Sequence, residues 1–471
     1  LAQLAEGAAV VVTGQQVGLF LGPLYTLYKA ATAVVVARAL AAESGQPVVP
    51  VFWLQTEDHD LPEIATTAVR SARGAPTPLA VPADAADRRS IAHRVLPPEV
   101  SSVLDMLTEA LGGLPHAAEH LARLRHHYTP GAPWSVAFAG LLAELFADEG
   151  LVLVDPRCEA LARAAAPVHR RALMEAEALA SALEVRSAAL EALGYTPAVH
   201  VRPGAPLCFV HEGGPEGPRY RVEPTPGSAG SLTVVGGAAR TTTTELLARL
   251  EAEPLAFSSS ALLRPIVQDT LLPTAAYVGG PGELAYFAQL EPLYAAYDLP
   301  MPLVVPRARF VIVDDKVRRV LERLGLSATE VSAPEDVVLA RVAARAAAHA
   351  GAPAAVSLEA RLLEPLGREL VALRGELAGL GLESALEKTE AAVRGAVAKL
   401  VEKHDKARVH QDAERVEDVR RVRAQLYPGE APQERVLGLS YHAARVGERA
   451  LVAAVLAAIE PWQWSLQELS L

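Results

Sequence analysis

Short and almost continuously apolar segments recur along the chain. Each is followed by glycine-rich or polar residues and then by a helical pattern. The clearest are Ala8–Val12, Pro47–Leu54 and Leu151–Val154, with further candidates at Thr274–Val278 and Leu303–Val305. Strands that are apolar on both faces and alternate with helices are typical of a parallel sheet covered on both sides. The pattern therefore predicts an α/β protein with a parallel-sheet core.

Changes in the pattern divide this scheme into parts. Residues 71–98 are rich in Pro, Ala and charge, which predicts a surface insertion. Residues 196–245 hold two β-like runs around the turn residues Glu212–Gly217, which predicts a small antiparallel β insertion. The core is then discontinuous and is expected to consist of residues 1–70, 99–195 and 246–333.

The C-terminal third has a different character. Residues 334–426 are dominated by Ala, Leu, Glu, Lys and Arg, and apolar residues recur there at helical spacing, namely Leu380, Leu382, Leu386, Val393, Val397 and Leu400. The pattern predicts long antiparallel helices that form a coiled-coil domain with a dimer surface. An ordinary helical bundle packed on its own core would give the same pattern. Residues 427–471 are expected to pack back on the core.

Composition and charge narrow the class of function. A chain of 471 residues is expected to fold into more than one domain. Its net charge of −11 argues against a nucleic-acid surface, which needs a basic field. No apolar run approaches the ~20 residues of a membrane span. The two cysteines, Cys158 and Cys208, lie far apart in sequence, so a disulfide framework is not expected and a cytoplasmic location is favoured. The chain starts at Leu1 without a methionine, and we expect a segment to precede it.

The first apolar strand runs into a glycine-rich loop. Gly14, Gly18 and Gly22 permit tight turns and a close approach of the backbone to a ligand, and a helical pattern follows from Pro23. Lys29, near the start of that helix, could reach an anion held at the helix end. These four residues are candidates for binding a cofactor phosphate. An ordinary glycine turn followed by a solvated lysine would also give this pattern.

The same loop carries polar side chains that a bare turn does not need. Gln15 and Gln16 are adjacent, and Tyr25 shares a helix face with Lys29 because the two are four residues apart. We therefore predict that Gln15, Gln16 and Tyr25 bind substrate.

A second polar turn follows the second strand. Glu57, Asp58 and His59 arrive where the carboxyl end of a parallel strand is expected, which is where α/β proteins bind ligands. A carboxylate there could hold an ammonium or a metal, and His59 could act as a general base. These three are the catalytic candidates. Asp60 fits the role of a helix N-cap and is assigned to capping.

Further candidates surround the fourth strand. Arg264 precedes it, and Glu283 and Tyr286 follow it after a Gly-Gly-Pro-Gly turn. Arg307 follows the fifth strand and could pair with a carboxylate or a phosphate. All four are predicted to bind substrate. Glu283 also suits the first turn of a helix, and a lone arginine often has a structural role.

The cysteines and histidines of the sequence lack the spacing of a zinc site. There is no Cys-x-x-Cys pair, and His116 and His120 share a helix face with His126 and His127 nearby. Two imidazoles do not complete a site, and a solvated histidine-rich helix explains them. We expect no metal site from this pattern.

Taken together, these motifs resemble the bacillithiol biosynthesis cysteine-adding enzyme family, BshC. The matching segments are spread over nearly the whole chain. They are Thr13–Lys29, Pro47–Ile64, Arg264–Leu290, Met301–Arg309 and Ala431–Arg435.

The resemblance implies a Rossmann-like core similar to class I nucleotidyltransferases, with inserted modules, a C-terminal helical coiled-coil domain and a homodimer. It implies a ligase that adds L-cysteine to glucosaminyl-malate through an amide bond, in the last step of bacillithiol biosynthesis. ATP or another nucleotide is expected by analogy with the superfamily. The chain has neither a His-x-Gly-His signature nor a Lys-Met-Ser-Lys-Ser loop, and the metal requirement stays open. Two other functions remain: an adenylating enzyme that acts on a different acid, and a non-catalytic metabolite-binding scaffold.

Overall fold

The structure is a computed structural model that describes residues 1–471 except 72–75, 229, 238–239, 350–357, 378–379 and 411–412. The chain divides into two compact units. The first consists of Leu1–Phe310, Glu434–Leu466 and Leu471, and the second of Val311–Gln433 and Gln467–Ser470.

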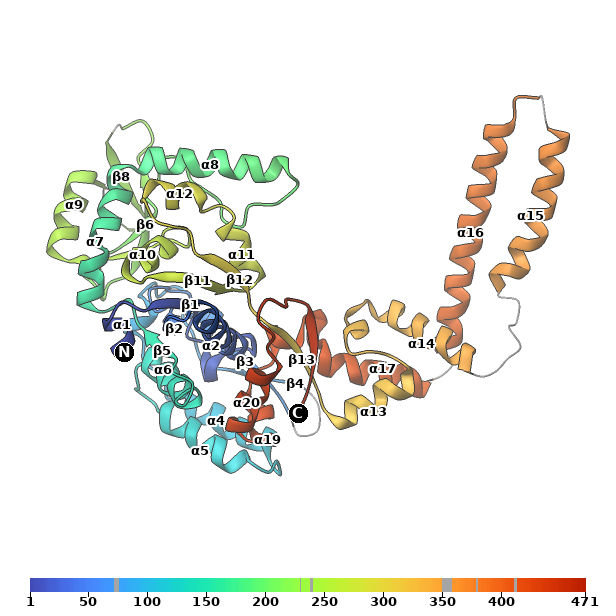
Figure 1. Cartoon of the computed structure of the whole chain (residues 1–471), viewed down its shortest axis with the longest axis horizontal. Coiled ribbons are helices and arrows are strands. Elements are labelled where there is room, and N and C mark those ends of the chain that lie inside the picture. Colours follow the sequence, from blue (N-terminus) through green and yellow to red (C-terminus); the bar gives the residue numbers. More distant parts are fainter. Residues whose placement is uncertain (72–75, 229, 238–239, 350–357, 378–379, 411–412) are drawn as a thin grey trace. The chain divides into compact units, whose positions relative to one another are not determined.

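A five-stranded parallel sheet forms the centre of the first unit (Figure 1). Its strands run in the order β12 (Leu303–Pro306), β11 (Thr274–Gly279), β1 (Ala9–Gln15), β2 (Val48–Leu54) and β5 (Val152–Val154). The chain starts in the middle of the sheet, builds outward through β2 and β5, and then returns to the other side of β1 with β11 and β12. This is the strand order of a Rossmann fold, with its switch point between β1 and β11. The predicted α/β class is confirmed.

The apolar strands are buried on both faces, as the pattern required. Val10 and Val12 of β1 face one hydrophobic cluster, in which they pack with residues of α7 (Glu159–Met174). Val11 faces the other way, into a cluster with residues of α2 (Tyr25–Ser44). Successive side chains of a strand point to opposite faces, so a strand covered on both sides is apolar at every position. The core therefore fixes β1 and leaves its carboxyl end free to carry polar groups.

A separate antiparallel sheet occupies the segment that was expected to be a β insertion. Its order is β10-β6-β7-β8-β9, so it also takes in β10 from beyond residue 245. The strands are β6 (Cys208–His211), β7 (Arg219–Pro224), β8 (Ser231–Val235), β9 (Arg240–Thr242) and β10 (Phe257–Ser259).

The segment 71–98 is not only a surface insertion. Within it, β4 (Pro76–Ala80) pairs with β3 (Thr66–Arg70), and the side chains of Ser90 and Ile91 are buried. The Ser90 hydroxyl donates to the carbonyl oxygen of Thr56 at 2.7 Å. Its Pro- and charge-rich composition predicted exposure, but this part of the segment lies against the turn that follows β2.

The remaining helices of the first unit surround these sheets. Residues Glu434–Leu466 return to it, where α19 packs on α5 and α20 packs on α2. The helices not yet given are α1 (Ala2–Ala5), α3 (Leu61–Ile64), α4 (Val100–Leu111), α5 (Ala117–His127), α6 (Trp134–Leu145), α8 (Ala176–Ala192), α9 (Thr243–Ala252), α10 (Arg264–Leu271), α11 (Pro281–Phe287), α12 (Glu291–Ala296), α19 (Ser440–Val446) and α20 (Glu448–Ala458).

The second unit is mainly helical and begins upstream of residue 334, because α13 belongs to its core. Val317 and Leu321 of α13 pack with Val338 of α14 and Val419 of α17. The elements are α13 (Asp315–Leu324), α14 (Glu335–His349), α15 (Leu358–Glu376), α16 (Glu383–His410) and α17 (Ala413–Leu426), with most of the strand pair β13 (Arg309–Val313) and β14 (Leu466–Ser470). Helix α18 (Gln433–Val436) follows and, from Glu434 on, belongs to the first unit.

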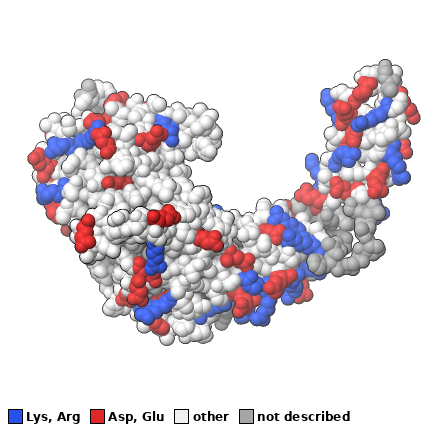
Figure 2. Space-filling view, in the orientation of Figure 1, with Lys and Arg blue, Asp and Glu red and all other residues white. Residues whose placement is uncertain are grey.

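Helices α15 and α16 form an antiparallel hairpin (Figure 1). Figure 2 shows acidic and basic side chains interspersed over its visible face, and Glu390 pairs there with Arg374 and Arg394. Large apolar side chains are also exposed on the hairpin, including Val371 and Leu400. No helix in the described parts of the chain has an apolar stretch that would span a bilayer.

Candidate functional site

A pocket of about 360 Å³ opens at the carboxyl ends of β1, β2, β11 and β12. This edge, at the switch point of the strand order, is where open α/β sheets bind ligands. The pocket is lined by most of the site residues predicted from the sequence: Gly14, Gln15, Gln16, Tyr25, Lys29, Asp58, Arg264, Glu283, Tyr286 and Arg307. Residues far apart in sequence therefore meet because each follows the end of a strand.

Lys29 is buried and fully engaged within the protein. Its ammonium donates to the carbonyl oxygen of Gly14 at 2.7 Å and to Oε1 of Gln15 at 2.8 Å, and it forms an ion pair with Glu283. An ammonium has three protons, so these contacts use all of them. We infer that Lys29 joins the first loop to α11. This geometry disfavours the predicted role of Lys29 in binding a cofactor phosphate.

Glu283 is held from several sides. It accepts from the backbone N–H of Gly280 at 2.8 Å and from the hydroxyl of Tyr277 at 2.6 Å, in addition to Lys29. Burial raises the pKa of Glu283, but the charge and hydrogen bond of Lys29 outweigh burial and lower it. Glu283 is therefore an ionised group that closes one wall of the pocket.

Arg264 is a buried cation whose hydrogen-bond partners are neutral. It donates to Oε1 of Gln268 at 2.8 Å, to the hydroxyl of Tyr286 at 2.9 Å and to that of Tyr277 at 3.3 Å. Arg435 also lines the pocket and is exposed. Among the residues that the structure describes, no carboxylate lies within ion-pair distance of either guanidinium. These two cations are available to an anionic ligand.

Arg307 differs from these two, because its charge is already paired. Its two terminal nitrogens each donate to a carboxylate oxygen of Glu434 at 2.8 Å, and both side chains are buried. Its guanidinium also lies over the ring of Tyr25, 5.6 Å from the centroid. Arg307 therefore forms part of the pocket wall. Its pairing with Glu434 supports a structural role for this arginine.

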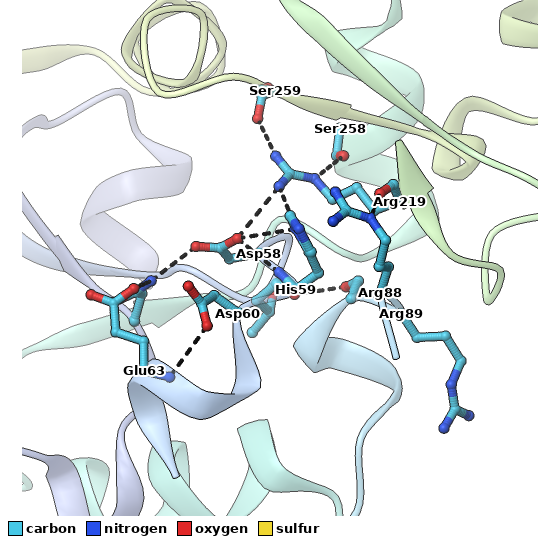
Figure 3. A network of polar contacts seen from close by, with 12 residues as sticks. Asp58, His59, Asp60, Glu63, Arg88, Arg89, Arg219, Ser258 and Ser259 are labelled. Atoms are coloured by element: carbon cyan, nitrogen blue, oxygen red, sulfur yellow. Dashed lines mark hydrogen bonds and ion pairs between the residues drawn. The ribbon is translucent and has the colours of Figure 1, made fainter. Parts of the chain in front are cut away.

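Asp58 is the carboxylate that the second turn contributes to the pocket (Figure 3). Its Oδ2 accepts from the amide of Gln16 at 2.9 Å, and its Oδ1 accepts from the backbone N–H of His59 at 2.7 Å. Nη1 of Arg219 lies 3.4 Å from Oδ1. Burial raises the pKa of Asp58, but the hydrogen bonds and the charge of Arg219 outweigh it and hold this pKa well below its usual range. Asp58 is therefore an anion that suits a ligand ammonium.

His59 does not line the pocket, although it lies beside Asp58 (Figure 3). Its Nδ1 lies 3.1 Å from Nη1 of Arg219. The same Nδ1 lies 3.4 Å from Oδ1 of Asp58. Because an arginine N–H can only donate, we assign Nδ1 of His59 as the acceptor toward Arg219. A neutral His59 then carries its proton on Nε2 and has no free lone pair. The geometry thus disfavours the general-base role predicted for His59.

Glu57 lies behind the pocket and not in it. Its side chain is buried and borders a separate cavity of about 10 Å³ with Arg157 and His169. Burial raises the pKa of Glu57, while the neighbouring arginines and the backbone N–H of Ser259 lower it less strongly. Adjacent residues of an extended turn point in different directions, and here Asp58 is the one that faces the ligand space.

Gly18 and Gly22 are likewise not brought to this pocket. They border an adjoining pocket of about 450 Å³, which shares Gln16 and Tyr25 with the first. A Cβ at Gly18 would lie 3.0 Å from the Cα of Gly22, so glycine is needed for close packing. The N–H groups of Gly18, Leu21 and Gly22 already bond to Gln16, Tyr128 and Leu19. These three N–H groups are therefore used within the protein.

Several residues of the site were missed by sequence reasoning. Gln55, Tyr277 and Arg435 line the pocket, and Arg219 contacts Asp58 from β7. Tyr277 was assigned to a strand and Arg435 to a matching segment without a role. A single arginine at the start of a predicted strand gives no signal that it reaches another module.

The two cysteines and a cluster of possible metal ligands lie away from this pocket. Cys158 and Cys208 are free thiols that do not line it. Away from it, His126, His127 and Glu144 place ligand atoms within 4.8 Å of one another. Glu144 also forms an ion pair with Arg123 at 3.0 Å, so a metal there would compete with a bound cation.

Comparisons with known proteins agree with this architecture. Residues 1–308 match the family "Bacillithiol biosynthesis BshC, N-terminal Rossmann-like domain", and residues 310–469 match "Bacillithiol biosynthesis BshC, C-terminal coiled-coil domain". Proteins named "Putative cysteine ligase BshC" are similar over most of the chain. The one from Koribacter versatilis is 33% identical over 448 residues, 94% of this chain and 81% of the relative. That from Salinibacter ruber is 34% identical over 444 residues, 92% and 77% of the two chains. The chain therefore belongs to the bacillithiol biosynthesis BshC family.

Proposed function

We propose that this chain is a ligase that joins L-cysteine to glucosaminyl-malate by an amide bond, as the last step of bacillithiol biosynthesis. The names of its relatives support a cysteine ligase. The observation that carries the proposal is the charge pattern of the strand-end pocket. Besides Glu283, whose charge is paired with Lys29, it presents the ionised carboxylate of Asp58 together with two guanidiniums, Arg264 and Arg435, that lack a carboxylate partner in the described structure.

These charges suit the two substrates. Cysteine carries an ammonium, for which Asp58 is the partner. Glucosaminyl-malate carries carboxylates, for which Arg264 is the partner. Gln15, Gln16, Tyr25 and Tyr286 supply neutral polar groups around them. The thiol that the product gains comes from the substrate, which fits a pocket that the protein's own cysteines do not line.

Amide formation from a carboxylate requires activation, and we propose ATP as the co-substrate. In the activation step, a carboxylate oxygen of cysteine attacks the α-phosphorus and displaces pyrophosphate. In the joining step, the amine nitrogen of glucosaminyl-malate forms a bond to the cysteine carboxyl carbon while the C–O bond to phosphate breaks. AMP is the leaving group, and its phosphate takes the proton that the nitrogen loses.

The residues present fit a phosphate group only in part. Arg435 offers charged N–H donors, which stabilise charge that develops on phosphate oxygens. In the first loop, the N–H groups of Gly18 and Gly22 are already bonded within the protein. We therefore assign phosphate binding to Arg435.

The experiment that tests this proposal is a reconstitution. Purified protein is incubated with glucosaminyl-malate, cysteine and ATP, and bacillithiol is measured by mass. We expect product in the complete mixture and none when any one substrate is omitted. Product formed equally well without ATP would contradict the activation step, and product from a different acid but not from glucosaminyl-malate would contradict the substrate.

A further inference from the structure

Arg219 reaches the acidic turn from a different module. It is the first residue of β7 in the antiparallel sheet, and its side chain is buried. Figure 3 shows it between the Asp58–His59 turn and the serines of β10. Nη1 lies 3.4 Å from Oδ1 of Asp58 and 3.1 Å from Nδ1 of His59.

The other end of the guanidinium is fixed to β10. Nε donates to the hydroxyl of Ser258 at 2.9 Å, and Nη2 donates to the carbonyl oxygen of Ser259 at 2.8 Å. The plane lies over the ring of Phe209, with 3.6 Å between Cζ and the ring centroid. Because Nε and Nη2 are held by β10, the planar guanidinium fixes the direction in which its third nitrogen, Nη1, points. The ammonium of a lysine, on its flexible chain, would not be oriented in this way.

The backbone is held by the same segment that holds the acidic turn. The N–H of Arg219 donates to the carbonyl oxygen of Arg88 at 2.8 Å, and the N–H of Ile91 donates to the carbonyl oxygen of Asp58 at 2.7 Å. Residues 88–91 therefore link β7 to the turn that follows β2. This link fixes the distance between Arg219 and Asp58.

We propose that Arg219 is a positioning residue that holds the Asp58 carboxylate in place for the ammonium of cysteine and donates a hydrogen bond to Nδ1 of His59. The role of Asp58 toward cysteine rests on the proposed function. Through Arg219 the inserted antiparallel module takes part in the site at the strand ends of the parallel sheet.

The electrostatics agree with this arrangement. Arg219 faces Asp58 and Glu57 as opposite charges and Arg157 and Arg88 as like charges. Its charge is one of the causes that lower the pKa of Asp58, against the burial that raises it. His59, Gln16 and, through Gln16, Glu63 complete the groups around that carboxylate. Removal of Arg219 therefore raises the pKa of Asp58.

The test compares Arg219→Gln and Arg219→Lys with a matched control, Arg221→Gln. Arg221 lies on the same strand, is partly exposed and pairs with Glu223. Cysteine binding is measured by calorimetry, and kcat/KM for cysteine is measured as a function of pH. We expect Arg219→Gln to lower cysteine affinity about 10- to 100-fold, the size of a lost hydrogen bond to a charged group. The acid limb of its pH profile should move to higher pH. Arg219→Lys should recover part of the affinity, and Arg221→Gln should match wild type.

A double variant separates positioning from a general loss of structure. If Arg219 acts through Asp58, Asp58→Asn/Arg219→Gln should bind cysteine no more weakly than Asp58→Asn alone. Effects that simply multiply, or an Arg219→Gln protein with wild-type affinity and pH profile, would overturn the proposal. Calorimetry needs no turnover, so a chain that binds cysteine but makes no bacillithiol would contradict the proposed reaction and still test Arg219.

Discussion

Replacing Lys29 with methionine tests whether this lysine is part of the framework or a ligand-binding cation. Its three protons are used by Gly14, Gln15 and Glu283, and its side chain is almost fully buried, with 4% exposed. Lys29→Met removes one partner of a buried ion pair, which typically costs about 3–5 kcal/mol. Glu283 keeps the donors of Gly280 and Tyr277 and is 19% exposed, so we expect the low end, about 3 kcal/mol.

Urea unfolding followed by tryptophan fluorescence measures this cost. Trp53 and Trp134 are both fully buried in the first unit, so their emission reports on the unit that holds the pair. The control is Lys29→Met/Glu283→Gln, which removes both charges. Since a buried pair replaced by neutral groups is often nearly as stable, the double variant should regain at least ~1 kcal/mol.

Two results would contradict a framework role for Lys29. If Lys29→Met unfolds at the same urea concentration as wild type but loses binding of phosphate or substrate, Lys29 is a ligand-binding cation, as the sequence alone predicted. If the single and double variants lose the same stability, the two residues are not coupled.

Three further predictions follow from the same geometry. Arg264→Gln should raise KM for glucosaminyl-malate about 10- to 100-fold and leave the urea midpoint within the range of Arg221→Gln; unchanged kinetics would exclude Arg264 from substrate binding. Burial lowers the pKa of His169 to about 4, so the unfolded chain binds more protons between pH 6.5 and 4 and stability falls as pH falls. When the pH falls from 7 to 5, the free energy of unfolding of His169→Asn should decrease by about 2 kcal/mol less than that of wild type. Equal decreases in the two proteins would contradict this prediction. We also expect a homodimer through the exposed apolar side chains of the α15–α16 hairpin, so Leu400→Asp should shift the mass measured by light scattering from dimer to monomer, whereas a monomeric wild type would refute this.

The parallel-sheet core could be predicted because its signal is local. Segments such as Ala8–Val12 are apolar at successive positions, and burial on both faces leaves few other structures for them. The ends of those strands then placed Gln16, Asp58 and Glu283 near one another without any knowledge of the packing.

The roles of individual side chains could not be predicted in this way, because they depend on partners distant in sequence. Arg307 was predicted to bind substrate, but its charge is paired with Glu434, which lies 127 residues away in the sequence. Glu57 and Asp58 are neighbours in sequence, yet one is buried behind the pocket and the other faces it. The composition of residues 71–98 predicted exposure, whereas Ser90 and Ile91 are bound to the turn after β2.

We propose that cysteine is joined to glucosaminyl-malate in the strand-end pocket. The most direct measurement is the rate of bacillithiol formation by wild type, Asp58→Asn and Asp60→Asn. Asp60 lies in the same turn but caps α3 and does not line the pocket. We predict that Asp58→Asn lowers the rate at least ~10-fold at subsaturating cysteine, since a charged partner is lost, while Asp60→Asn stays near wild type. Equal rates for Asp58→Asn and wild type would contradict the assignment of this pocket.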